Sequence, residues 1–272
     1  MKKIRFWYLM ILWFGFSFYS YSTDNLRFAD MKTLALGNNG ATESVLFNPS
    51  LIALSERKTL KINYFNKYQL KELGSVSAAF LYPNRLLPVA LHINSFGYDA
   101  YRESLFRISV GKILNKRWAV GVGIHYSLLE TDLYEERRGR IATDIGASFR
   151  PFDNLLIGML ILNTPSVRIQ TKEVENDIFT GYVLQLGFRW EIINNLLITG
   201  NMGTCEAEEL TGALGVEYQA FSSFYLRAGV QAEPLLPGFG VGYGFASFTL
   251  DLATVYHPVL GMSTGIGLSY SF

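Results

Sequence analysis

The chain has 272 residues, of which 49% are hydrophobic, 15% are aromatic and only 17% are charged. Soluble domains usually carry about 25% charged residues, so the composition argues against an ordinary soluble protein. The mean hydropathy of +0.17 is too low for a bundle of lipid-facing helices. A β-barrel in a membrane fits both values, because only alternate residues of each strand face lipid.

The formal net charge of +1 gives no basic excess of the kind that nucleic-acid-binding proteins show. Without Lys2, Lys3 and Arg5 the chain would hold 21 basic and 23 acidic residues, a net charge of −2. The one cysteine, Cys205, excludes an intramolecular disulfide and a cysteine cluster for zinc. We expect it to be a small strand residue.

Residues 1–22 have the organisation of a cleaved signal peptide. MKKIR is a positive start, residues 6–19 are almost continuously apolar, and Ser20 and Ser22 supply small residues before a cleavage site. The alternative is a membrane anchor, but the apolar run of roughly 14 residues is shorter than a spanning helix needs. The sequence therefore predicts export, with a mature chain that starts near Thr23.

Residues 23–58 lack the alternation of a strand and predict a short N-terminal plug. One or two helices are expected, interrupted at residues 37–40 (GNNG). Asn48 and Pro49 resemble the cap and first turn of a helical stretch through Leu54. Such a segment can fold back into a barrel lumen, and the alternative is a disordered periplasmic leader.

From residue 59 to the end, apolar and small or polar residues alternate with the period of a strand. Fourteen strands are expected, at 59–70, 73–82, 87–98, 103–113, 117–130, 138–151, 154–164, 177–191, 194–205, 208–220, 222–233, 237–247, 248–257 and 259–272. The fold class is therefore all-β, a transmembrane antiparallel up-and-down β-barrel over residues 59–272.

The last strand shows which row of side chains faces lipid. Met262, Ile266 and Leu268 share one face, whereas Gly265 and Gly267 share the other. A barrel of about 14 strands has a lumen too wide for one row of large side chains to fill. Large residues facing lipid and small ones facing the lumen remove this difficulty. The alternative is a soluble β-sandwich, in which the row of small and polar residues would face water and would solubilise the protein poorly.

The connections alternate between short and long. Short turns at 83–85, 115–117, 152–154, 193–195 and 221–223 suit the periplasmic side, and longer loops at 95–103, 129–140 and 165–177 suit the outside. Both ends of the chain would then be periplasmic. We expect the charged run of Glu135, Glu136, Arg137, Arg138 and Arg140 to lie in an external loop as a solvated tip or a lipopolysaccharide contact.

Residues that could perform chemistry are few and dispersed. By alternation, the polar side chains expected to face the lumen are His92, His125, Arg189, Glu217 and Arg227. His257 is also expected to face inward, on a strand distant from the other two histidines. No G-x-S-x-G segment occurs, and we predict no catalytic residues, no metal and no cofactor.

Two motifs carry a family resemblance. Leu36, Gly37, Asn38, Asn39 and Gly40, followed by Asn48, Pro49, Ser50 and Leu51, resemble the L-G-G and N-P-A/S-x-L stretches of the FadL-like outer-membrane superfamily, and within it the PorV/PorQ proteins of Bacteroidota. Asn38 replaces the second glycine of that pattern. Tyr270 and Phe272 are similar to the C-terminal signal by which the barrel-assembly machinery recognises its substrates.

The resemblance implies a non-enzymatic protein in the outer membrane of a Gram-negative bacterium, in contact with its lipid. The first hypothesis is a docking component of protein secretion, of the type IX kind, with secretion-system proteins as partners. The second is a FadL-like transporter that passes a hydrophobic ligand through a plugged lumen and a lateral opening. A structural barrel without cargo is the third. Transport predicts an apolar inward patch near the plug and an interrupted wall, whereas docking predicts long external loops and no apolar path.

Overall fold

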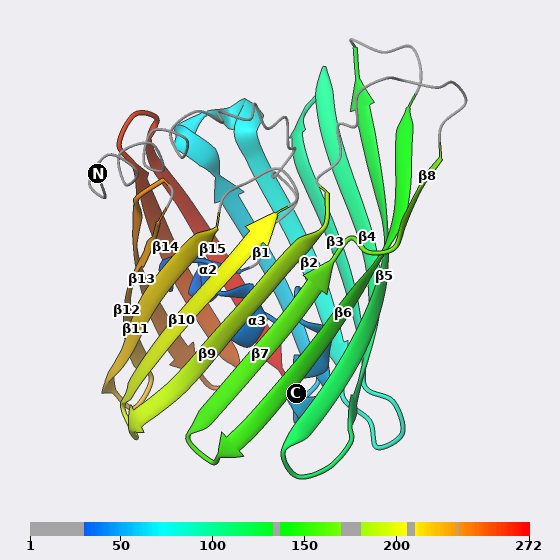
Figure 1. The fold of residues 1–272 in the computed structure, drawn as a ribbon. Coiled ribbons are helices and arrows are strands. Elements are labelled where there is room, and N and C mark those ends of the chain that lie inside the picture. Colours follow the sequence, from blue (N-terminus) through cyan, green and yellow to red (C-terminus); the bar gives the residue numbers. More distant parts are fainter. Residues whose placement is uncertain (1–29, 133–136, 170–180, 206–209, 233) are drawn as a thin grey trace, which may run out of the picture.

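The structure is a computed structural model and describes residues 30–132, 137–169, 181–205, 210–232 and 234–272. The expected signal peptide, residues 23–29 of the expected plug, Glu135 and Glu136 lie outside this part of the chain. Fourteen antiparallel strands form a closed barrel, which confirms the predicted fold class (Figure 1). They are β1 (Thr59–Asn66), β2 (Gly74–Tyr82), β3 (Val89–Tyr98), β4 (Tyr101–Ile113), β5 (Trp118–Thr131), β6 (Arg138–Phe152), β7 (Leu155–Leu162), β9 (Val183–Ile193), β10 (Leu196–Cys205), β11 (Thr211–Phe221), β12 (Phe224–Gln231), β13 (Leu236–Phe245), β14 (Phe248–His257) and β15 (Gly261–Ser271).

Each strand pairs with its neighbours in sequence, and β1 pairs with β15 to close the ring. The closing register sets Thr59 opposite Ser271 and Asn66 opposite Thr264. Phe272 N–H donates a hydrogen bond of 2.9 Å to the carbonyl of Lys58, so the end of the chain meets the start of the barrel. Closure satisfies the backbone of every wall strand, which a hydrocarbon surrounding requires.

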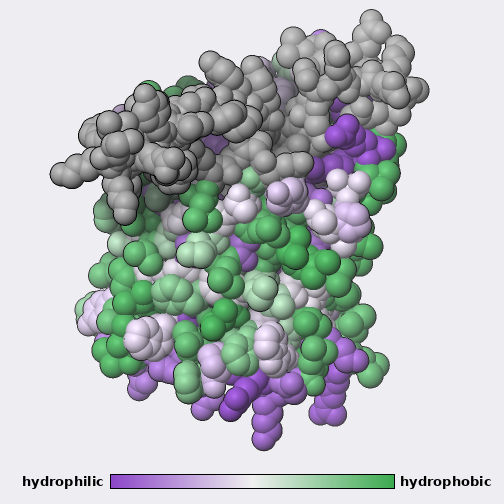
Figure 2. All heavy atoms as spheres, in the orientation of Figure 1, coloured by the Kyte–Doolittle hydropathy of each residue, from purple (hydrophilic) through white to green (hydrophobic). Residues whose placement is uncertain are grey.

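The two faces of the wall have the predicted assignment. On β15, Leu268 is 40% exposed on the outer surface whereas Ser263 is 5% exposed. Figure 2 shows apolar side chains across the middle of one face of the barrel and hydrophilic ones along its lower edge. This is the arrangement of a barrel surrounded by lipid.

The lower end of the barrel in Figure 1 carries the short turns and the C-terminus, and we call it the short-turn rim (residues 83–88, 114–117, 153–154, 194–195, 222–223 and 246–247). Aromatic rings stack beside it. Ring centroids are 4.7 Å apart for Phe248 and Tyr270, 5.2 Å for Tyr270 and Phe272, and 4.5 Å for Trp118 and Phe149. Aromatic girdles are typical of the interface between lipid and water.

Three expectations at the opposite end are wrong. β1 stops at Asn66 and is followed by the 3₁₀ turns η2 (Lys67–Gln69) and η3 (Lys71–Leu73). The expected loop at 95–103 is strand, because β3 and β4 continue their pairing to Tyr98 opposite Tyr101. Arg138 and Arg140 fell in both the expected loop at 129–140 and the expected strand at 138–151; the strand is correct, because they lie in β6 and are only 6% and 5% exposed.

The expected loop at 165–177 begins with a strand, β8 (Ser166–Ile169). β7 pairs with the lower part of β6 and with β9, ending at Leu162 opposite Val183. Asn163 then takes a left-handed conformation with φ of 62°, and β8 pairs with the upper part of β6 from Gly139 to Ala142. Within the described residues β8 has no strand on its other edge. The described wall is therefore interrupted between β8 and β9, which are joined by residues that include 170–180, outside the described part of the chain.

Three short helices lie inside the barrel, α2 (Met31–Ala35), α3 (Gly40–Glu43) and the 3₁₀ helix η1 (Pro49–Leu54) (Figure 1). α2 contacts β12–β15, α3 contacts β7 and β9, and η1 contacts β4–β6. Residues 30–54 therefore form a plug that touches the wall on several sides. None of the helices in the described ranges is long and apolar enough to cross a bilayer.

Candidate functional site

The plug lies directly against glycines of the wall. A Cβ atom on Gly215 would be 2.6 Å from the carbonyl oxygen of Leu36, and one on Gly111 would be 2.7 Å from that of Pro49. Real Cβ atoms do not approach so closely, so the backbone of the plug occupies space that only glycine leaves open. Other glycines in close contact with the plug are Gly121, Gly146, Gly158, Gly187, Gly229, Gly240, Gly265 and Gly267.

The motif residues shape the plug. Asn48 is fully buried; its Oδ1 accepts from Ser50 N at 3.0 Å and its Nδ2 donates to the carbonyl of Ala41 at 2.6 Å. It is the N-cap of η1, with Pro49 in the first turn, as predicted. Ser50 is fully buried and Leu51 is 6% exposed.

The other motif forms the turn after α2. Leu36 is fully buried, and Gly37 and Asn38 both have positive φ, 79° and 61°. Asparagine tolerates this left-handed conformation better than most residues, so Asn38 can replace a glycine here. The next residue, Asn39, caps α3 and donates to the carbonyl of Gly200 at 3.2 Å.

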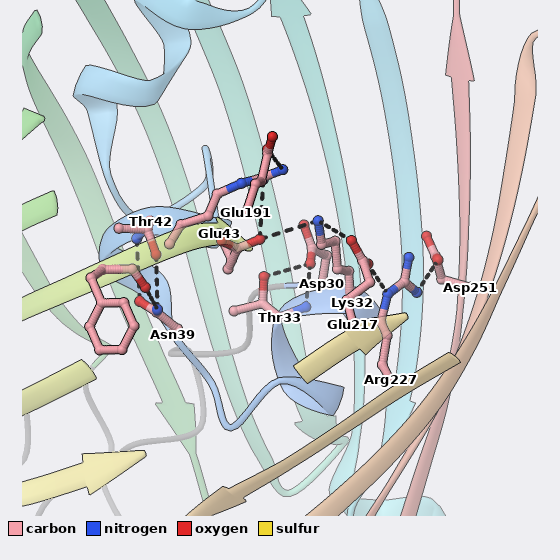
Figure 3. Close-up of polar contacts among 12 residues, drawn as sticks. Asp30, Lys32, Thr33, Asn39, Thr42, Glu43, Glu191, Glu217, Arg227 and Asp251 are labelled. Carbon is pink, nitrogen blue, oxygen red and sulfur yellow. Dashed lines mark hydrogen bonds and ion pairs between the residues drawn. The ribbon is translucent and has the colours of Figure 1, made fainter. Parts of the chain in front are cut away.

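A chain of ion pairs crosses the lumen through the plug (Figure 3). Lys32 of α2 lies 3.3 Å from Glu217 of β11 and 3.2 Å from Glu43 of α3. Arg227 continues it from Glu217 to Asp251, each contact 2.6 Å long. Arg189 continues it from Glu43, 3.5 Å away, to Glu191 at 3.0 Å. The charges alternate along all seven residues, which compensates each one in the interior.

A separate ion pair holds the start of α2. Asp30 caps this helix by accepting from Thr33 N at 2.9 Å, and its other oxygen lies 3.1 Å from Lys61 of β1. Burial alone would raise the pKa of the Asp30 carboxyl. The Lys61 ammonium and the hydrogen bonds from Thr33 outweigh burial, so the pKa lies below its usual value.

The wall of β3–β6 carries a second buried polar group. The register aligns His92, Arg107 and His125 in one row across three strands. His125 Nδ1 and Arg107 Nε each lie 3.0 Å from Oδ2 of Asp144, and Arg107 also donates to the carbonyl of Leu46 in the plug. The Arg107–Asp144 contact is an ion pair without the alignment of a hydrogen bond. Both ring nitrogens of His92 lack a hydrogen-bond partner within the described residues.

An apolar patch faces the lumen directly beside the interrupted wall. It consists of Phe47 from the plug, Leu160 and Leu162 from β7, and Val183 from β9. The first three are 7%, 3% and 5% exposed. Leu162 and Val183 are the last pair of the β7–β9 ladder before the strands separate. In this structure the four side chains pack against one another where β7 and β9 separate.

The predicted lumen-facing residues divide between these groups. Arg189, Glu217 and Arg227 join the ion-pair chain, whereas His92 and His125 belong to the β3–β6 row. His257 lies at the end of the barrel opposite the short-turn rim, where its Nδ1 accepts hydrogen bonds from the N–H groups of Val259 and Leu260, each 3.1 Å long. Within the described residues no cluster of histidine, cysteine and acidic side chains is placed to bind a metal.

Other functional residues were not anticipated from the sequence. Lys32 and Glu43 carry the ion-pair chain through the plug, but single charges in a short helix give no signal of their partners. The apolar patch combines residues from the plug, β7 and β9, so it can be recognised only once the pairing of β7 with β9 is known. Asn163 and Pro165 are turn-forming residue types, a signal for the break in the seventh strand that the prediction of strands from alternation did not use.

Comparison with known proteins identifies the fold. No family model matches the sequence, and no curated protein matches it. The toluene transporter TodX of Pseudomonas putida superposes with a TM-score of 0.66 at 10% identity, over 91% of this chain and 99% of its own. A FadL homologue of Pseudomonas aeruginosa gives a TM-score of 0.59 at 12% identity, over 89% of this chain and 97% of its own. The chain therefore has the fold of FadL-type outer-membrane barrels.

Proposed function

We propose that this chain is a non-enzymatic, FadL-like transporter that admits small hydrophobic molecules across the outer membrane without a cofactor. The observation that carries the proposal is that, among the described residues, the wall is unpaired between β8 and β9, next to the apolar patch of Phe47, Leu160, Leu162 and Val183. A molecule dissolved in the lipid could leave it sideways and reach an apolar surface without crossing the polar lumen.

Docking of secretion proteins, the function that the PorV/PorQ resemblance implied, has weaker support. It required long external loops and no apolar path. Two residues join β3 to β4 and thirteen join β8 to β9, so only part of the loop requirement is met, and the patch supplies an apolar surface. The similar structures TodX and the FadL homologue are a toluene transporter and a FadL protein by description. These observations favour a hydrophobic ligand over secretion-system proteins as the partner.

The proposal also includes the cell biology that the sequence predicts. The signal peptide would direct the chain through the inner membrane, and Tyr270 and Phe272 would be read by the barrel-assembly machinery. The short-turn rim would then face the periplasm, and the outer aromatic residues would contact outer-membrane lipid.

Uptake of a naphthylamine dye that fluoresces on entering a membrane tests the proposal in a Gram-negative host whose outer membrane excludes the dye. We expect faster uptake in cells that make the protein than in vector-only cells. Leu162→Asn should abolish the gain, because it puts an amide into the apolar patch. Leu105→Asn is the matched control, since Leu105 is equally buried on β4, away from the break. Equal uptake by the two variants, or no gain in the wild type, would contradict the proposal.

A further inference from the structure

We propose that the transported molecule passes the plug along the inner face of β7 and β9, that α3 closes this route, and that a cavity below α3 at the short-turn rim is its exit. The inference rests on the proposed transport function and adds the path, its gate and the residues that form them.

The inward-facing residues of β7 and β9 connect the two ends of this path. On β7 they run from Leu162 and Leu160 in the apolar patch, through Gly158, to Leu156 in the cavity. On β9 they run from Val183 in the patch, through Gln185 and Gly187, to Arg189 and Glu191 in the cavity. Two residues of a strand advance by about 6.8 Å, so patch and cavity are about 14 Å apart along β7 and about 20 Å apart along β9. The layer between them consists of Gly158, Gln185 and Gly187.

α3 occupies that layer. Gly158 and Gly187 lie directly opposite each other in the ladder. A Cβ on Gly187 would be 2.7 Å from Oδ1 of Asn39 and 3.0 Å from Cβ of Ala41, and one on Gly158 would collide with the carbonyl of Ala41. The helix therefore sits on a two-glycine seat, between the patch above it and the cavity below.

Polar contacts along the whole of α3 hold the gate closed. Its cap Asn39 donates to the carbonyls of Phe188 and Gly200, Asn48 donates to the carbonyl of Ala41, and Glu43 forms ion pairs with Lys32 and Arg189. The Glu43 side chain is fully buried, and its Oε1 has no hydrogen-bond partner within the described residues. Part of its hydrogen-bonding capacity is thus unused in the closed arrangement, which lowers the cost of releasing it.

The cavity has a volume of about 320 Å³ and lies between the plug and the β6–β7 turn. One part of its lining is apolar: Val45, Leu51, Leu54, Leu155 and Leu156. The other part carries the charges of Glu43, Arg150, Asp153, Arg189 and Glu191. Sites for small molecules typically measure roughly 300–1,000 Å³. An apolar surface beside charged groups suits a small hydrophobic molecule that is about to enter water.

The experiment combines two opposite changes on β7. Gly158→Ala should displace α3, raising both dye uptake in cells and single-channel conductance of the purified protein in planar bilayers. Leu156→Trp should fill the cavity and reduce dye uptake to the vector-only level. In the double variant, Leu156→Trp should also remove the increase in conductance caused by Gly158→Ala, because both residues lie on one path.

Two controls address the location of the path. Gly121 lies on β5, and Gly121→Ala introduces the same kind of clash, here with Pro49 of η1. This change should raise conductance less than Gly158→Ala. Ser222→Trp places the same side chain at an exposed turn of the same rim and should leave uptake unchanged. Slower gel migration after boiling verifies that each barrel is closed.

The outcomes distinguish the inference from the function on which it rests. If wild-type cells take up no more dye than vector-only cells, the transport function is wrong and the inference falls with it. If wild-type uptake is normal but Leu156→Trp behaves like Ser222→Trp, transport stands and the exit is elsewhere. A conductance that rises equally with Gly121→Ala and Gly158→Ala would show that α3 is not the gate.

Discussion

Glycines on the inner face of the wall decide where the plug can lie. Gly111, Gly215 and Gly187 each leave space that the plug backbone or a plug side chain fills. Contacts between the inner face and the plug are already close-packed. A larger side chain on the inner face should therefore disturb the plug, whereas the outer face would accept it. The outer face is sensitive instead to charge, since lipid cannot solvate it.

Leu268 and its neighbour Gly267 test both sensitivities within one strand. Leu268→Arg places a charge on the lipid-facing surface, at a cost that reaches about 2–4 kcal/mol at the membrane midplane. Gly267→Ser acts on the lumen face instead: a Cβ there would lie 2.5 Å from Oδ1 of Asn63 on β1, whose flexible side chain can shift, and 3.2 Å from Cγ of Met31 in the plug. We expect lower unfolding stability in urea from the first change, and higher conductance with normal assembly from the second. Impaired assembly with Gly267→Ser alone would contradict the assignment of faces.

Asp30 makes the plug sensitive to acid. Because its pKa is lowered in the folded chain, its ion pair with Lys61 stabilises the plug above the usual carboxyl pKa of 3.8, and this contribution disappears as pH falls through the lowered value. We expect conductance to rise on acidification below pH 3.8. Asp30→Asn retains a cap for α2 but not the charge, and should conduct more at neutral pH with less dependence on acid. An unchanged acid response in this variant would exclude Asp30 as its source.

Strands were more predictable than the segments that interrupt them. Period-two alternation located all fourteen wall strands, because every strand has one face toward lipid and one toward the lumen. It could not separate β7 from β8, since the change of partner at Asn163 depends on how β6 pairs. The turn between Tyr98 and Tyr101 was mistaken for a loop because Asp99 and Arg102 resemble solvated loop residues. Arg138 and Arg140 were assigned to a loop for the same reason.

The plug was partly predictable. Its caps are local, so Asn48 and Pro49 indicated η1, whereas the contacts of Lys32, Glu43 and Asp30 join distant segments and left no local pattern. The glycines of the wall were expected to leave room for a plug. Which glycine meets which helix follows only from the barrel register.

Asn48 offers a test of the plug as a folded element. Asn48→Ala removes the cap of η1 and also the hydrogen bond to the Ala41 carbonyl, next to α3. Loss of a cap costs about 0.5–2 kcal/mol, and we expect a value toward the upper end, with faster proteolysis of residues 30–54 in detergent. Ser50→Ala keeps the cap and removes only its hydroxyl contact with Asn48, so it should have a smaller effect. Equal protection of the plug in all three proteins would contradict the role assigned to Asn48.

At the scale of the whole molecule, the described wall is unpaired between β8 and β9, and the plug lies inside the barrel. The ion-pair chain from Asp251 to Glu191 ties the plug to both β9 and β11. In the proposed function, a plug fixed in this way blocks water and ions, while the apolar patch beside the break admits molecules that arrive from the lipid. The account therefore requires selectivity for hydrophobic molecules, which neither an open pore nor a protein-docking barrel would show.

Paired uptake measurements test that requirement most directly. Cells that make the protein are given the hydrophobic naphthylamine dye and, separately, a hydrophilic sugar of similar size. We predict faster entry of the dye than in vector-only cells and no change in entry of the sugar. Faster entry of both compounds would show an open pore, and no change for either would show that the barrel does not transport small molecules; each result would contradict the account.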